Sequence, residues 1–134
     1  MNIYLKINIT VYYLKIIKII KKIKKNCNKN IANTINSNME LYVTRFNSIT
    51  YKENKDWLQK NNETGCVYGS PIKLSTKVLP NTSIIVLEMN NSNNKIEGIG
   101  IIKNKIIYKK YKIYINNNYN RFIYKSNLYI SRNN

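Results

Sequence analysis

The chain has 134 residues, 43% of them apolar, which is enough for one domain with a modest core and no disulfides. Its 23 Lys and Arg against 6 Asp and Glu give a net charge of +17, which favours a polyanionic partner or an anionic membrane surface. The absence of histidine excludes Ser-His-Asp and Cys-His catalytic pairs and histidine-ligated metal sites.

The basic charge is concentrated at the two ends of the chain. All six acidic residues lie between Glu40 and Glu97, whereas residues 1–38 carry eight lysines and no acid. Residues 98–134 also sum to +8. Such flanks suit phosphates or anionic lipid heads. Isoleucine, asparagine, lysine and tyrosine make up 81 of the 134 residues, so the codon bias of an AT-rich genome, such as that of a large DNA virus, is an alternative source of the basicity.

The two cysteines favour a reducing compartment. Cys27 and Cys66 are far apart and form no CxxC motif, so neither a zinc site nor a disulfide framework is indicated. We therefore expect no metal and no cofactor. The sequence also lacks a clean apolar signal core and a small-residue cleavage site, so we expect an intracellular, cytoplasmic protein that is not secreted.

Residues 1–38 differ from the rest of the chain. Apolar residues alternate over positions 3–11, after which Lys15, Lys18, Lys22 and Lys25 recur at helical spacing. Three interpretations stay open: a basic amphipathic segment that lies on a membrane or a nucleic acid, a disordered extension, or untranslated sequence upstream of Met39. We therefore divide the chain into an extension, residues 1–38, and a domain, residues 39–134.

The first half of the domain mixes strand and helix signals. We expect a strand over residues 41–46, a loop over 48–52, a short helix over 53–60, a strand over 66–68 and a turn over 69–71.

The second half has mainly strand signals. Residues 83–89 read as a strand covered on both faces, 90–95 as a turn, and 96–103 as the partner strand. Gly98 and Gly100 share one face of that partner, so a bulky side chain or a ligand is expected to approach the backbone there. Residues 106–115 alternate as a further strand, and 122–130 as a last pair of short strands. The expected class is α+β.

The order of these elements resembles the PUA-like superfamily, in particular its YTH, EVE and ASCH-type domains. The likeness rests on Val67, Tyr68 and Ser70, followed by the hairpin of residues 82–103. It implies a small β-barrel with one or two short helices. YTH-type domains hold a methylated adenine in an aromatic cage, so the resemblance implies a base pocket near Tyr68 and Ser70, with Asn47 and Trp57 as further ligand-binding candidates.

A nucleic-acid-binding function also follows from the residue types. The alternation places Tyr108, Lys110, Lys112 and Tyr114 on one strand face, with Arg121 and Lys125 later in the sequence. Aromatic rings stack on bases and cations pair with phosphates. We expect a non-enzymatic domain that binds RNA or a modified nucleotide.

Two alternatives use other features of the sequence. In the first, the chain is a structural or interaction protein whose basic ends contact a partner or an anionic membrane, and residues 1–38 make the membrane contact. In the second, it is an enzyme. The acid-base groups of the domain are Glu53, Asp56, Glu88 and Glu97, which show no known catalytic spacing, so no enzyme is expected.

Overall fold

The computed structural model describes residues 40–133, which form an α+β unit. The elements are β1 (Glu40–Phe46), α3 (Ser48–Lys60), β2 (Cys66–Ser70), β3 (Ser83–Asn90), β4 (Lys95–Lys103), the 3-10 helix η1 (Asn117–Asn120), β5 (Phe122–Ser126) and β6 (Leu128–Ser131). The expectations for residues 1–38, the extension, lie outside the described residues.

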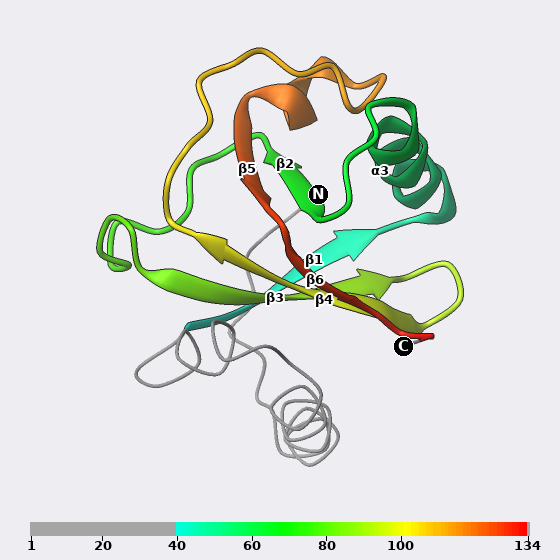
Figure 1. Ribbon diagram of the computed structural model, residues 1–134, viewed down its shortest axis with the longest axis horizontal. Coiled ribbons are helices and arrows are strands. Elements are labelled where there is room, and N and C mark those ends of the chain that lie inside the picture. Colours follow the sequence, from blue (N-terminus) through cyan, green and yellow to red (C-terminus); the bar gives the residue numbers. More distant parts are fainter. Residues whose placement is uncertain (1–39, 134) are drawn as a thin grey trace.

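The strands form two sheets, and α3 lies on the same side of the larger sheet as the smaller one (Figure 1). The larger sheet has the order β1-β3-β4-β6, with β1 parallel to β3 and the other pairs antiparallel. The smaller sheet pairs β2 with β5 in antiparallel fashion. The α+β class is confirmed, but the six strands make two open sheets and not one closed barrel.

The β3–β4 hairpin follows the predicted pattern. Ile84 and Val86 of β3 face the smaller sheet and α3, and both are buried. The two glycines of β4 lie on this inner face, where a Cβ on Gly98 would lie 2.2 Å from the Tyr129 hydroxyl and one on Gly100 would lie 2.2 Å from the Tyr68 hydroxyl. The bulky groups that approach this strand are therefore tyrosine side chains.

Helix α3 begins earlier than predicted, because residues 48–52 are helical and not a loop. A capping box starts it: the Asn47 side-chain oxygen accepts from the Thr50 backbone nitrogen (2.8 Å), and the Thr50 hydroxyl accepts from the Asn47 backbone nitrogen (3.0 Å). Asn47, a ligand-binding candidate in the sequence, is the N-cap residue of this helix.

Strand β2 extends two residues beyond its predicted end. Gly69 pairs with Ile123 and Ser70 with Phe122, so these two residues continue the strand instead of forming a turn.

The prediction of a strand over residues 106–115 is wrong. Among the described residues, this part of the chain is irregular, and its backbone pairs with a strand at one isolated bridge, between Ile107 and Ile123. The Asn120 side chain replaces the missing strand partner: its oxygen accepts from the backbone nitrogens of Ile113 and Tyr114, both at 3.0 Å, and its nitrogen donates to the Tyr114 carbonyl (2.8 Å). The alternation of apolar and polar residues here therefore belongs to an extended chain. A side chain, and not a neighbouring strand, bonds the backbone groups of Ile113 and Tyr114.

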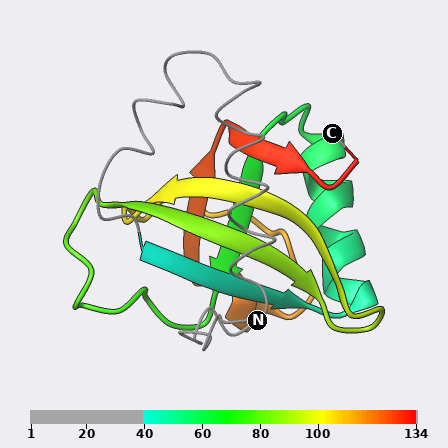
Figure 2. The ribbon, with the colours of Figure 1, turned by 90° about the horizontal axis from the view of Figure 1, so that it is seen from below.

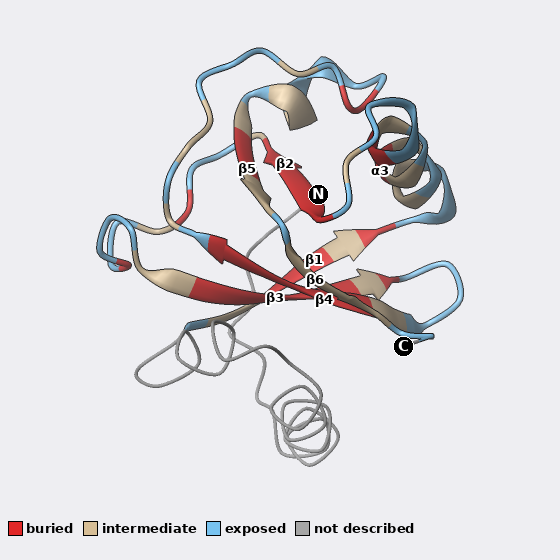
Figure 3. Cartoon of the chain, viewed as in Figure 1, coloured by how far each residue is buried: buried red, intermediate tan, exposed pale blue. Residues whose placement is uncertain are grey.

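The core lies between the larger sheet on one side and the smaller sheet with α3 on the other (Figure 3). Its largest fully buried side chains are those of Tyr68, Tyr114, Tyr124 and Phe46. Within residues 40–133, no helix has the length and apolar character that crossing a bilayer requires.

We predict that Gly100→Ala destabilises the full-length protein by about 1–3 kcal/mol, because the new methyl group overlaps the Tyr68 hydroxyl and the Cys66 sulfur, 2.7 Å away. Urea unfolding measures the loss. Lys103→Ala, on the exposed end of the same strand, is the control and should change the free energy of unfolding by less than about 0.5 kcal/mol. Equal stabilities of the two variants would contradict the close approach.

Candidate nucleic-acid interface

Tyr68, expected to line a base pocket, is fully buried in β2. Its hydroxyl donates to one oxygen of Glu88 on β3 (2.9 Å), across the space between the two sheets. A base could stack on this ring only if β2 separated from the larger sheet. In the described structure, Tyr68 is thus part of the core, and the expected pocket around it is not present.

The partner of Tyr68 is the centre of a buried polar network. The Glu88 side chain has no exposed surface, and its second oxygen accepts from the Tyr129 hydroxyl (3.0 Å) and from the Lys55 ammonium (2.9 Å). The Lys55 nitrogen also lies over the ring of Tyr129, 4.6 Å from its centre. Two hydroxyls and one ammonium thus satisfy a carboxylate that would be very costly to bury alone.

Burial beside Glu88 raises the pKa values of the neighbouring thiol and tyrosine hydroxyls. Desolvation raises the pKa of the Cys66 thiol to about 12, and the Glu88 carboxylate adds to this effect. Desolvation and the negative charge of Glu88 also raise the pKa values of Tyr68 and Tyr129. These groups stay protonated at neutral pH, so the tyrosines donate hydrogen bonds to Glu88.

The other residues expected beside Tyr68 have structural contacts. Ser70 is fully buried, and its hydroxyl accepts from the Ile72 backbone nitrogen (3.3 Å) in the turn that follows β2. Trp57 on α3 is half-buried and packs edge-on against Tyr111, with ring centres 4.9 Å apart. Asn47, Trp57, Ser70 and Tyr68 therefore do not come together as one ligand site.

A different group of residues is exposed together, in the connection that follows β4. Residues 103–112, called here the basic segment, contain five lysines, all exposed: Lys103, Lys105, Lys109, Lys110 and Lys112. Tyr108 lies among them with 89% of its surface exposed. The segment therefore presents an aromatic ring and several cations to solvent.

Only some residues of the predicted stacking face are exposed. Tyr108, Lys110 and Lys112 are exposed, but Tyr114 is buried and its hydroxyl lies 3.0 Å from the side-chain nitrogen of Asn54 on α3. Tyr114 is therefore a core residue and not a stacking platform.

The two predicted cations that come later in the sequence have different surroundings. Arg121 is exposed and lies over the Phe122 ring, 5.6 Å from its centre. Lys125 is half-buried and forms an ion pair with Glu63. Arg121 is thus more available to an anion than Lys125, whose charge is already balanced.

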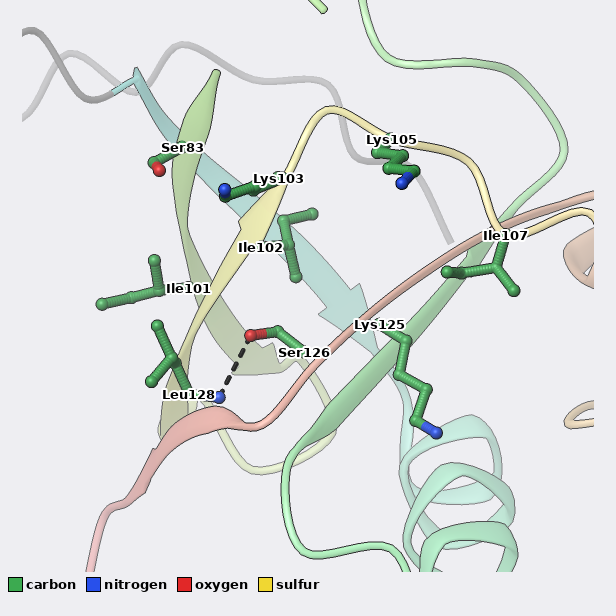
Figure 4. A pocket seen from close by; sticks show the side chains of 9 residues that line it. All are labelled: Ser83, Ile101, Ile102, Lys103, Lys105, Ile107, Lys125, Ser126 and Leu128. Carbon is green, nitrogen blue, oxygen red and sulfur yellow. Dashed lines mark hydrogen bonds between the residues drawn. The ribbon is translucent and has the colours of Figure 1, made fainter. Parts of the chain in front are cut away.

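A pocket of about 220 Å³ opens between the end of β4 and the β5–β6 junction (Figure 4). Its apolar lining comes from Ile101, Ile102, Ile107 and Leu128, and its charged lining from Lys103, Lys105 and Lys125. None of the described residues that line it is acidic. The pocket is thus continuous with the basic segment, which contributes Lys103, Lys105 and Ile107.

Sequence reasoning missed Lys103, Lys105 and this pocket. The available signal was the unbroken absence of acid after Glu97, which marks the whole C-terminal part as basic. The pocket itself forms between residues far apart in sequence, so no local pattern indicates it. Among residues 40–133, no group of three potential metal ligands of the His, Cys, Asp or Glu type comes together.

We predict that Lys55→Met lowers the free energy of unfolding of the full-length protein by about 2–4 kcal/mol, because it leaves the Glu88 carboxylate buried without its cation. Chemical denaturation measures the change. Lys52→Met is the matched control on the same helix; its ion pair with Asp56 is exposed, so the loss should be below about 0.5 kcal/mol. Similar losses for both variants would show that the buried pair adds no more than a surface pair.

We also predict that stability falls as the pH rises from about 9 to 12, in part through Cys66. Over this range the unfolded chain loses the thiol proton while the folded protein keeps it, so deprotonation favours unfolding. Urea midpoints across this range test the effect in a Cys27→Ser background. Adding Cys66→Ala should make the decline shallower, whereas an unchanged slope would contradict the raised thiol pKa.

Comparisons with known proteins give no family for the chain. No family model matches it, and neither the curated proteins nor the solved structures contain a significant match. The resemblance to PUA-like domains thus depends on the sequence motifs alone, and function has to be inferred from the chemistry of the side chains described above.

Proposed function

We propose that this protein is a non-enzymatic binding protein for single-stranded nucleic acid, with RNA or a modified nucleotide as its ligand and the basic segment as its interface. The observation that carries the proposal is the 89% exposure of Tyr108 among five exposed lysines. Sequence-tolerant single-strand binding needs this combination, since cations hold the phosphates and an aromatic face stacks on a base.

The charge of the surrounding chain supports the same function. No acidic residue follows Glu97, so the basic segment is not balanced by acids of its own part of the chain. Lysines attract the phosphate backbone without reading its sequence, and releasing counterions makes such binding salt-dependent. An exposed ring favours a single strand, because duplex bases are already stacked on one another.

The pocket beside the basic segment offers a place for one base. Its volume, about 220 Å³, is smaller than the roughly 300–1,000 Å³ of pockets for drug-sized ligands, so it suits one small planar group. Ile101, Ile107 and Leu128 would contact the apolar faces or a methyl group, while Lys103 and Lys105 would hold the adjoining phosphate. This pocket replaces Tyr68 as the site for a modified base.

The proposal includes a PUA-like architecture for the α+β fold. It is supported by the order of strand, helix, strand and hairpin, with Tyr68 of β2 packed over Gly100 of the hairpin. An intracellular, cytoplasmic location belongs to it as well, supported by two cysteines without a disulfide framework.

Fluorescence anisotropy of the full-length protein with labelled single-stranded RNA tests the proposal. Tyr108→Ala should weaken binding by about 1–3 kcal/mol, or roughly 5- to 150-fold in Kd. The triple variant Lys109→Gln, Lys110→Gln, Lys112→Gln should reduce the slope of log K against log salt by about 2, because each engaged lysine contributes about 0.7.

The matched control removes the same number of charges elsewhere: Lys60→Gln, Lys77→Gln, Lys95→Gln, all exposed and outside the basic segment. This control should keep most of the salt slope of the unmodified protein. Equal effects of the two triple variants would show that charge alone, and no particular site, binds RNA. Flotation with anionic vesicles but no RNA binding at low salt would replace the proposal with the membrane alternative.

A further inference from the structure

The outer face of the larger sheet, which points away from the core, is aliphatic over its central part. On β3, Ile84, Val86 and Glu88 face inward, so the residues between them face outward. Residues that are paired on neighbouring strands lie on the same face, so the pairing register identifies the outward residues of β1, β4 and β6. The aliphatic residues of the outer face are Leu41, Val43, Ile85, Leu87, Ile99, Ile101, Leu128 and Ile130; the register also places Arg45, Ser83, Met89 and Lys103 towards its ends.

Five of these side chains are buried without belonging to the core. Val43, Ile85, Leu87, Ile99 and Ile101 have between 2% and 8% of their surface exposed, yet none is in the cluster formed with β2, β5 and α3. Figure 2 looks onto this face and shows the four strands in front, with β2, β5 and α3 behind them. No described helix or strand covers the face, so another layer has to account for this burial.

We propose that residues 1–38 of the same chain form this layer, as an intramolecular cover of the outer face. They lead directly into β1, which is an edge strand of the sheet in question. Four strands spaced by about 4.8 Å make a face narrow enough for a segment of this length to cross. No linker is needed to bring the segment to the face.

The composition of the segment fits an aliphatic surface. Residues 1–38 contain ten isoleucines, and Ile16, Ile17, Ile19, Ile20 and Ile23 fall between lysines in the part with helical spacing. Contact through the isoleucines would leave the lysines facing water. The eight lysines of the segment would then enlarge the basic surface of the protein.

The cover would also keep the aliphatic outer face away from water. A continuous aliphatic sheet face left open to water would promote association between copies or adsorption to lipid. Because the occupant is part of the same molecule, its effective concentration is high and no partner is required. The cover does not involve Tyr108, Lys109, Lys110 or Lys112 of the basic segment. Two residues of the outer face, Ile101 and Leu128, also line the pocket beside that segment, so the cover would border this pocket.

Methyl NMR of the full-length protein tests the inference directly. With labelled Ile, Leu and Val methyl groups, we expect nuclear Overhauser contacts between residues 16–23 and Leu87 or Ile99 within one molecule. A sample that mixes two labelling schemes separates contacts within a chain from contacts between chains. Contacts found only between chains would assign the face to a second copy, and absence of any contact would overturn the proposal.

A pair of matched variants adds a second measurement. Ile17→Asp with Ile20→Asp should detach the cover, which would make the Leu87 and Ile99 methyl groups accessible to a soluble paramagnetic agent and raise binding of a hydrophobic dye several-fold. Lys18→Asp with Lys22→Asp changes as many residues but keeps the isoleucines, so it should leave both readings unchanged. Equal behaviour of the two variants would contradict the cover, and if the isoleucine variant fails to fold, the contacts in the unmodified protein decide.

Discussion

The buried carboxylate of Glu88 connects most of the fold. It lies on the central strand β3 and accepts from Tyr68 on β2, Tyr129 on β6 and Lys55 on α3. A buried charge is tolerated only with partners in place, so these four elements have to assemble in one arrangement. Gly98 and Gly100 on β4 leave the room that the two tyrosine hydroxyls need.

This constraint separates the two faces of the larger sheet. On the inner face, polar groups meet one another and the glycines keep the packing close. The outer face contains aliphatic residues such as Leu87 and Ile99, which can be covered by any apolar surface of suitable size. The inner face thus specifies a unique structure, and the outer face is suited to docking.

Several elements could be predicted from local pattern alone. The β3–β4 hairpin follows from a short run of apolar residues on both faces of one strand, an asparagine-rich turn and a second strand, all of which are local signals. The early start of α3 was missed, although its Asn47 cap and Thr50 form a local signal. The strand expected over residues 106–115 was wrong because alternation cannot show that the side chain of Asn120 will satisfy the backbone.

The sequence by itself determined the charge distribution and the β3–β4 hairpin. Only the tertiary structure decided which tyrosines are available for binding. Tyr108 and Tyr114 belong to the same alternating run, yet Tyr108 is exposed while the Tyr114 hydroxyl meets Asn54, 60 positions earlier in the chain. The reason is physical, because burial depends on contacts between distant residues, whereas charge and periodicity are properties of neighbours.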